Sequence, residues 1–201
     1  GFTKDETEYA LIDLNFLGVN NVLLLRGDVK TLEPVQDPEN YHEHATDLQQ
    51  QVNLFNKGVA LDGSHIDGIE TPFSYGMACY PEKHEEAPNM ESDIYYAKEK
   101  VKNGANYLVT QMFFDNSKYF AFVERCRKEG IEVPIVPGIK PIVFKNQLTV
   151  LPKIFRSDIP EPFAAELRKC KSDEDAMEVG IEWCIGQCKE LIAHGVPSLH
   201  F

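Results

Sequence analysis

The sequence predicts an α/β fold built on a parallel sheet, and two observations carry this prediction. Short apolar runs of strand length alternate with longer segments whose apolar residues recur at helical spacing. Four of these helical segments end at a glycine a few residues before the next apolar run, namely Gly18, Gly104, Gly130 and Gly195. Glycine readily adopts the left-handed turn that ends a helix, so this recurrence indicates a βα repeat.

The N-terminal part is predicted to contain two helices and one strand. Thr3 and Glu6 have the spacing of a capping box at the start of the first helix. Residues 22–25 form an apolar run that is typical of a strand buried on both faces of a parallel sheet. The predicted elements are, in order, a helix from Thr3 to Gly18, a strand over 22–25, a loop over 29–41, a helix from about His42 to Gly58, and a surface loop over 59–72.

The central stretch, residues 73–115, reads as a βαβ unit. A strand over 73–79 ends at Pro81, a helix starts at Asn89 or Ser92 and ends at Gly104, and a second strand runs over 107–114. Polar residues follow both strands. In such units the functional groups gather at the carboxyl ends of the strands, so we expect the site there.

The C-terminal part continues the same alternation. Its predicted elements are a helix capped by Ser117 and ending at Gly130, a strand over 133–136, a loop over 139–147, a short helix through Leu148 and Phe155, a helix with Pro162 in its first turn, a long helix capped by Ser172 and ending near Gly195, and a strand over 198–201. This gives five strands and seven helical segments in one domain over residues 1–201. A (β/α)₈ barrel needs eight strands, so either three lie outside this chain or the sheet is open.

Composition narrows the classes of function. The formal net charge of −12 argues against a nucleic-acid partner, because such proteins present basic surfaces. No apolar run is long enough for a membrane span, and the N-terminus, which lacks a methionine and the features of a signal peptide, suggests a trimmed or domain-cut chain. The five cysteines contain no Cys-x-x-Cys pair, which favours a reducing, cytoplasmic compartment. Cys184 and Cys188 lie one helical turn apart, but no further ligands complete a metal set, so we expect a structural role.

Arg26, Gly27 and Asp28 follow the first predicted strand directly. A solvated turn is the simpler interpretation of this tripeptide. At the carboxyl end of a strand, however, Gly27 lets the backbone approach a ligand closely. A carboxylate such as Asp28 held near an electron-accepting ring disfavours negative charge on that ring, which lowers its reduction potential.

The central stretch supplies cations and a strand amide. Lys83, His84 and Lys100 offer this acidic chain positive groups for an anionic ligand such as a pyrophosphate, although a surface loop and a solvated lysine are the alternatives. Gln111 is predicted inside an apolar strand, where its amide needs partners. It serves either the structure alone or the polar edge of a heterocycle.

Six motifs, in this order and spacing, are similar to those of one enzyme family: Leu25-Arg26-Gly27-Asp28, Tyr80-Pro81-Glu82-Lys83-His84 with Glu86-Ala87, Gly104-Ala105-Asn106, Thr110-Gln111-Met112-Phe113-Phe114-Asp115, Pro137-Gly138-Ile139-Lys140-Pro141, and Leu199-His200-Phe201. Over nearly its whole length the chain resembles the methylenetetrahydrofolate reductases. The resemblance implies a (β/α)₈ TIM barrel, of which this chain holds about five of the eight strands. It also implies a cytoplasmic flavin oxidoreductase of one-carbon metabolism and methionine biosynthesis.

The resemblance further implies residue roles. Its FAD contacts correspond here to Arg26, Gly27, Asp28, His44, Ala45, Tyr80, His84, Ala87, Asp93 and Lys100. Asp28 and Gln111 take catalytic roles, and Gln111 and Gln147 contact the folate substrate. Three positions depart from some members of the family: His44 replaces a tyrosine, Tyr96 an asparagine and Glu99 an arginine.

The implied reaction reduces 5,10-methylenetetrahydrofolate to 5-methyltetrahydrofolate by ping-pong hydride transfer from NAD(P)H through FAD. The family's general acid is a glutamate on the first barrel strand, and no residue of this chain matches it. We expect a homo-oligomer without nucleic-acid or membrane partners. The rival interpretation is a truncated, non-catalytic barrel fragment that binds no cofactor. A barrel for phosphorylated substrates would need a Gly-rich phosphate loop, and the single glycine of residues 195–198 does not provide one.

From the implied role of Asp28, we expect Asp28→Asn to raise the flavin reduction potential, because the lost charge no longer disfavours electron density on the ring. Folate reduction should slow more than flavin reduction by NAD(P)H. Stopped-flow absorbance of the two half-reactions measures this difference. Equal slowing of both half-reactions would contradict the assignment.

Overall fold

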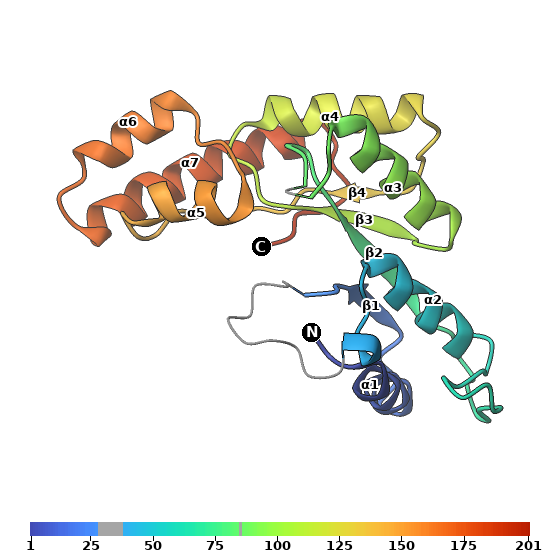
Figure 1. Cartoon of the computed structure of the whole chain (residues 1–201). Helices are drawn as coiled ribbons and strands as arrows, with labels where there is room; N and C mark the ends of the chain where they lie inside the picture. The colour runs from blue at the N-terminus through green and yellow to red at the C-terminus, as the bar shows by residue number, and fades with distance from the viewer. Residues whose placement is uncertain (28–37, 85) are drawn as a thin grey trace. The chain divides into compact units, whose positions relative to one another are not determined.

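The computed structural model describes residues 1–27, 38–84 and 86–201, in which helices and parallel strands alternate as an α/β fold (Figure 1). Asp28 lies outside the described residues. The elements are α1 (Lys4–Phe16), β1 (Asn21–Leu24), a 3₁₀ turn (Pro38–Asn40), α2 (Ala45–Phe55), β2 (Ser74–Cys79), α3 (Met90–Lys102), β3 (Tyr107–Thr110), α4 (Asn116–Lys128), β4 (Ile135–Val136), α5 (Gln147–Phe155), α6 (Glu161–Lys169) and α7 (Asp173–Ala193).

The chain forms two compact units. The N-terminal unit comprises residues 1–78 and 100–106, and the C-terminal unit comprises residues 79–99 and 107–201. No helix in the described part of the chain is long and apolar enough to cross a membrane.

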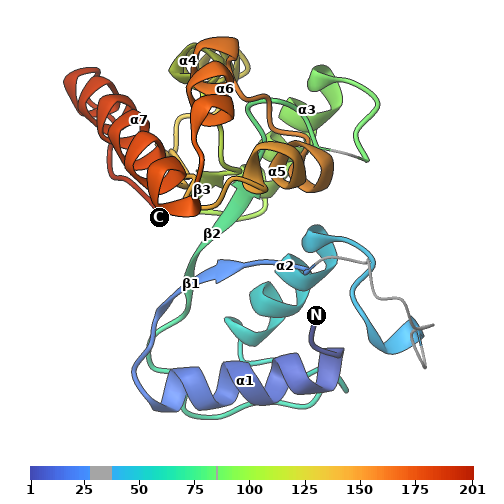
Figure 2. The same cartoon turned by 90° about the vertical axis from the view of Figure 1, so that its left-hand side faces the viewer.

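In the N-terminal unit, β1 pairs in parallel with β2, with Asn21 opposite Ser74 and Leu24 opposite Met77. The predicted capping box of α1 is confirmed, because the Glu6 N–H donates to the Thr3 hydroxyl and the Glu6 carboxylate accepts from the Thr3 N–H. Helices α1 and α2 lie side by side (Figure 2). The prediction that the first strand is buried on both faces is wrong. Among the residues of β1 only Leu24 is buried, and Asn21 at the start of the strand is exposed.

A buried tyrosine ties the elements of the N-terminal unit together. The Tyr75 hydroxyl donates toward Asn53 Oδ1 (2.7 Å), and Gln49 Nε2 donates both to this hydroxyl (3.2 Å) and to the Lys100 carbonyl (2.7 Å). A Cβ on Gly104 would lie 2.8 Å from the same hydroxyl, and Gly104 has a φ of +115°. Glycine at this position therefore both ends α3 and leaves room for Tyr75.

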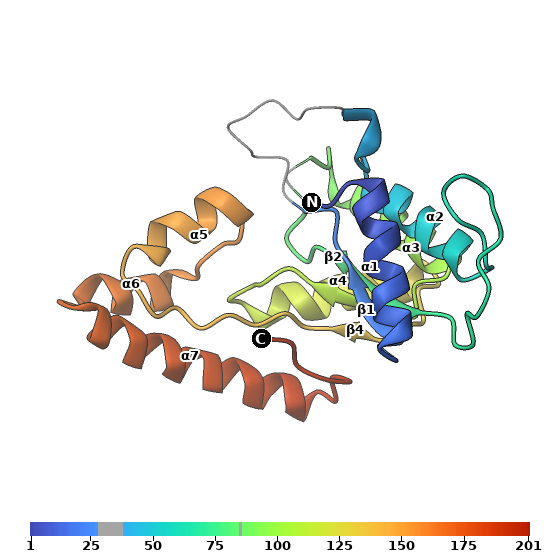
Figure 3. The same ribbon diagram turned by 90° about the horizontal axis from the view of Figure 1, so that it is seen from below.

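In the C-terminal unit, β3 pairs in parallel with β4, with Leu108 opposite Ile135. Its hydrophobic core gathers residues from the loop after β3 and from α5, α6 and α7: Phe114, Ile142, Leu151, Phe163, Leu167, Cys170 and Ala176. Helix α6 lies beside α7 (Figures 1 and 3). The described residues thus contain four strands, where the sequence predicted five, and an α-helix in each of the seven predicted helical segments.

The element boundaries confirm some predictions and correct others. Ser172 caps α7, as predicted, and the structure adds a capping box with Asp175. The cap of α4 is Asp115, whose carboxylate accepts the Ser117 N–H, so the prediction of Ser117 is wrong. The predicted strand over 198–201 is reduced to a single bridge between Gly138 and His200.

Helix α7 is fixed to the loop after β3 by two side chains one helical turn apart. Trp183 Nε1 donates to the Phe114 carbonyl (3.0 Å), and Gln187 Nε2 donates to the Phe113 carbonyl (3.1 Å). The Trp183 ring also stacks on Phe163, with centroids 4.5 Å apart. Gly180 lies about one turn nearer the start of α7 than Trp183. It contacts the backbone of Ile142 so closely that a Cβ on residue 180 would overlap the Ile142 carbonyl oxygen.

We expect Gly180→Ala to lower the free energy of unfolding by about 2–4 kcal/mol, because the backbone of Ile142 has to move away from α7. Gly186→Ala, on the same helix with nothing near its Cβ, is the control. It should raise stability by about 0.5–1 kcal/mol through helix propensity alone. Urea unfolding followed by circular dichroism measures both, and equal effects would contradict the close contact at Gly180.

Candidate functional site at the carboxyl ends of the strands

The sequence-predicted site residues divide between the two units. Asp28 lies outside the described residues. Arg26, Gly27, His44, Ala45 and Lys100 belong to the N-terminal unit. Tyr80, His84, Ala87, Asp93, Gln111 and Gln147 belong to the C-terminal unit.

In the N-terminal unit, Arg26 links the carboxyl end of β1 to the start of α2. Its Nη1 donates to the Glu43 carbonyl (2.9 Å), directly before His44, the N-cap of α2. The next residue, Gly27, is exposed and has a φ of +85°. The structure therefore gathers Arg26, Gly27, His44 and Ala45 at a helix N-terminus, where backbone N–H groups and the helix dipole favour an anion.

Lys100 reaches from α3 to the carboxyl end of β2. Its ammonium donates to the Ala78 carbonyl (2.8 Å), and the side chain is half-buried. The alternative of a solvated lysine is therefore wrong. This contact places a positive charge at the end of the strand that leads to Tyr80.

In the C-terminal unit, the loop after β2 brings four predicted residues together. The rings of Tyr80 and His84 meet edge to face, with centroids 4.4 Å apart. The His84 N–H donates to the Asp93 carboxylate (2.6 Å), and the Ala87 N–H donates to the His84 carbonyl (3.2 Å). The described part of this loop, residues 80–84 and 86–87 (below, the Tyr80–Ala87 loop), is therefore fixed to the first turn of α3.

The hydrogen bonds of His84 also fix its tautomer. The Glu86 N–H donates to His84 Nδ1 (3.2 Å), so Nδ1 is the acceptor of the neutral ring. The ring proton then resides on Nε2. The loop thus presents an N–H donor of the kind that binds an anionic oxygen.

Gln111 lies one residue beyond β3 and is half-buried, so the prediction of a buried strand amide is wrong. The strand ends at Thr110, just after the last residue pair with β4, Val109 opposite Val136. The Gln111 N–H donates to the Cys79 carbonyl (2.8 Å), which places Gln111 next to the start of the Tyr80–Ala87 loop. Its side-chain oxygen accepts the Met112 N–H (3.0 Å).

Gln147 begins α5 and organises the loop before it. Its side-chain oxygen accepts the N–H groups of Val143 (2.7 Å) and Phe144 (3.0 Å). Because two N–H donors meet this atom, it must be the amide oxygen. In both predicted folate residues, the side-chain oxygen accepts hydrogen bonds from backbone N–H groups. The NH₂ group of each amide, which can only donate, points away from these backbone groups.

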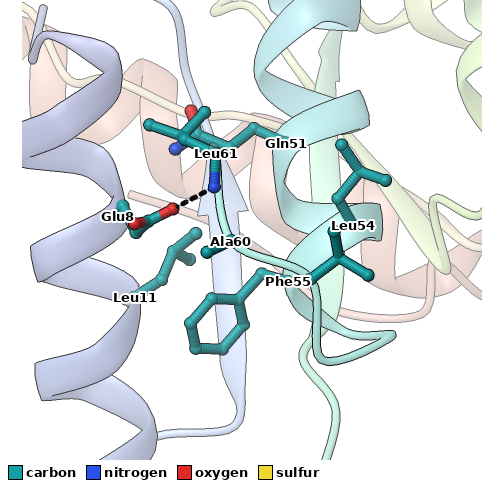
Figure 4. Close-up of a pocket in the computed structure, with 8 residues that line it drawn as sticks. Glu8, Leu11, Gln51, Leu54, Phe55, Ala60 and Leu61 are labelled. Atoms are coloured by element: carbon teal, nitrogen blue, oxygen red, sulfur yellow. Dashed lines mark hydrogen bonds between the residues drawn. The ribbon is translucent and has the colours of Figure 1, made fainter. Parts of the chain in front are cut away.

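A small hollow between α1 and α2 contains none of the predicted site residues (Figure 4). Its lining is apolar apart from Gln51 and Glu8, and the Glu8 carboxylate accepts the Leu61 N–H at 2.5 Å. It is therefore a feature of the packing of the N-terminal unit. No group of three or more His, Cys, Asp or Glu side chains in the described ranges could hold a metal ion.

Comparison with known proteins decides the family. The family model described as methylenetetrahydrofolate reductase matches residues 2–201. The chain belongs to the methylenetetrahydrofolate reductase family. A probable methylenetetrahydrofolate reductase (NADPH) of Caenorhabditis elegans is 33% identical over 99% of this chain and 28% of its own length. Methylenetetrahydrofolate reductase (NADH) 1 of Arabidopsis thaliana is 31% identical over 98% of this chain and 33% of its own.

A bacterial relative is matched over a larger share of its length. The 5,10-methylenetetrahydrofolate reductase of Salmonella typhimurium is 30% identical over 99% of this chain and 61% of its own length. The chain therefore spans about a third or less of the two eukaryotic relatives and 61% of the bacterial one. The family resemblance found in the sequence is confirmed over nearly the whole chain.

One group in this methylenetetrahydrofolate reductase family member was missed by sequence reasoning. Burial, together with the nearby carboxylates of Asp158 and Asp115, raises the pKa of Glu82 to about 7, against the opposing effects of the Asp158 N–H and the Lys118 ammonium. The Asp158 N–H lies 3.3 Å from each Glu82 carboxylate oxygen. Only the position of Glu82 between Tyr80 and His84 hinted at a role, because Asp158 is 76 residues away.

The raised pKa of Glu82 makes stability depend on pH. Between pH 4.5 and about 7 the folded protein holds a proton that the unfolded chain releases, so stability falls as pH rises through this window. We expect Glu82→Gln to remove this slope and to be more stable than the wild type above pH 7, by on the order of 1 kcal/mol after solvent screening of this partly exposed group. Below pH 4.5 the two proteins should agree.

Urea unfolding across this pH range measures the difference. Glu70→Gln, a change at an exposed loop residue, is the control and should leave the pH dependence unaltered. A Glu82→Gln variant with the wild-type slope would contradict the raised pKa.

Proposed function

We propose that this chain is the larger part of the catalytic (β/α)₈ barrel of a methylenetetrahydrofolate reductase. The protein would reduce 5,10-methylenetetrahydrofolate to 5-methyltetrahydrofolate with NADH or NADPH, using FAD in two successive half-reactions. The observation that carries the proposal is the family match over residues 2–201. The relatives from an animal, a plant and a bacterium, which are all named as methylenetetrahydrofolate reductases, support it.

Each unit by itself offers donor groups that suit an anionic part of a flavin dinucleotide. In the N-terminal unit, Arg26 and the exposed backbone at Gly27 lie at the N-terminus of α2. In the C-terminal unit, His84 offers its Nε2–H beside the Tyr80 ring. In a protein with a net charge of −12, such local donors are what an anionic cofactor requires. When bound, FAD supplies a ring that accepts a hydride and passes it on.

The two amides suit a folate substrate. Because backbone N–H groups occupy the side-chain oxygens of Gln111 and Gln147, both residues can donate through NH₂ to acceptor atoms of a pterin or of its glutamate tail. The hydrogen bonds to the side-chain oxygens also restrain both amides before the folate binds, so little further side-chain freedom is lost when it does. Asp28, which follows Gly27, would tune the flavin potential through its charge.

The test of this function is a pair of anaerobic half-reactions on the purified protein with FAD. Loss of the flavin absorbance on addition of NADH or NADPH, followed by its return on addition of methylenetetrahydrofolate, is the expected result. A protein that takes up no FAD, or whose reduced flavin is not reoxidised by the folate, would refute the proposal.

We expect Gln111→Ala to raise the folate concentration needed for half-maximal reoxidation about tenfold, the loss of roughly one hydrogen bond to substrate. The affinity for FAD should stay within about twofold of the wild type, since the role assigned to Gln111 is in the second half-reaction. Gln50→Ala, at an exposed position of α2, serves as the control. Loss of FAD binding instead would show that Gln111 supports the fold.

A further inference from the structure

The Tyr80–Ala87 loop is built around the side chain of one of its own residues. The Lys83 ammonium donates to the His84 carbonyl (3.0 Å) and to the Ala87 carbonyl (2.6 Å). Hydrogen bonds from a charged donor to carbonyl oxygens are stronger than those between neutral groups. The Lys83 ammonium therefore links two backbone carbonyls of its own loop, and these bonds use two of its three N–H donors.

The backbone conformation of Lys83 is one that normally belongs to glycine. Its φ is +79°, and Arg156 is the other described non-glycine residue with a positive φ. A side chain with a Cβ is disfavoured there, and such residues persist where the surrounding contacts hold them. The contacts of the Lys83 ammonium account for a lysine at this position.

The ammonium acts on the same residue that Asp93 holds from the other side. The His84 carbonyl accepts from Lys83, while the His84 N–H donates to the Asp93 carboxylate (2.6 Å). With both backbone groups of His84 fixed and Nδ1 bound by the Glu86 N–H, the ring lies edge to face with Tyr80. The direction of the Nε2–H bond then follows from these tethers.

We propose that Lys83 is a positioning residue for cofactor binding: its ammonium holds the carbonyls of His84 and Ala87 so that the loop presents the His84 Nε2–H donor to an anionic oxygen of the dinucleotide. This inference rests on the proposed function. It replaces the expectation that Lys83 itself pairs with a pyrophosphate. An ion pair across solvent is screened within about 10 Å at about 0.1 M salt, whereas a hydrogen-bonded loop is not.

Three variants separate positioning from charge. Lys83→Met removes the ammonium with little change in length, Lys83→Gly also relieves the positive φ, and Lys98→Met removes a positive charge from an exposed part of α3 where Lys98 pairs with Glu129 (3.5 Å). Amide hydrogen exchange at His84 and Ala87 is measured without cofactor. FAD affinity is then measured by flavin fluorescence at about 0.1 M and about 1 M salt, between which the screening length falls from about 10 Å to about 3 Å.

We expect both Lys83 variants to exchange the His84 and Ala87 amides about tenfold faster and to bind FAD about tenfold more weakly at both salt concentrations, with the melting temperature unchanged. Lys98→Met should match the wild type.

Wild-type behaviour of Lys83→Met would overturn the proposal, as would a loss of FAD affinity that disappears at high salt. Full affinity of Lys83→Gly would show that the backbone conformation alone suffices. A wild-type protein that binds no FAD would refute the proposed function, while the exchange rates would still decide whether Lys83 orders the loop.

Discussion

The end of a parallel strand leaves backbone groups without ladder partners, and the described units depend on side chains that supply the missing hydrogen bonds. Lys100 donates to the Ala78 carbonyl in the N-terminal unit. In the C-terminal unit, Gln187 and Trp183 donate to the carbonyls of Phe113 and Phe114. Because buried backbone groups must be paired, these contacts decide where the helices pack. The same strand ends carry the candidate site, so the interactions that complete the fold also shape the surface on which a ligand would bind.

Local sequence signals predicted the features that local chemistry controls. The capping box at Thr3, the cap at Ser172 and the glycines that end helices need only nearby residues, and all were found where expected. The end of β3 was not predictable in this way, because strand bounds depend on pairing with residues far along the chain, such as Val136 opposite Val109. The choice of Asp115 over Ser117 as a cap likewise depended on where the preceding strand stopped.

The candidate site shows the same division. Tyr80, His84, Ala87 and Asp93 come together because they are neighbours along one loop and the first turn of α3. The environment of Glu82 could not be inferred, because Asp158 reaches it from after α5. Lys83 was expected to serve a ligand through its charge, yet its ammonium serves the backbone. The closeness of these residues along the chain was visible in the sequence, while their hydrogen-bond partners could be known only from the fold.

The two contacts of α7 with the loop after β3 limit how chain length can vary in this family member. Trp183 and Gln187 meet the carbonyls of consecutive residues, and Gly180 rests on Ile142 one turn earlier. A shift of the helix by one residue moves it by about 1.5 Å and turns it by about 100°, which removes all three contacts at once. An inserted or deleted residue within 173–187 therefore cannot be absorbed by sliding. Over evolution, length changes near this helix should accumulate in the connection after Ala193, where the chain has left the last of these contacts.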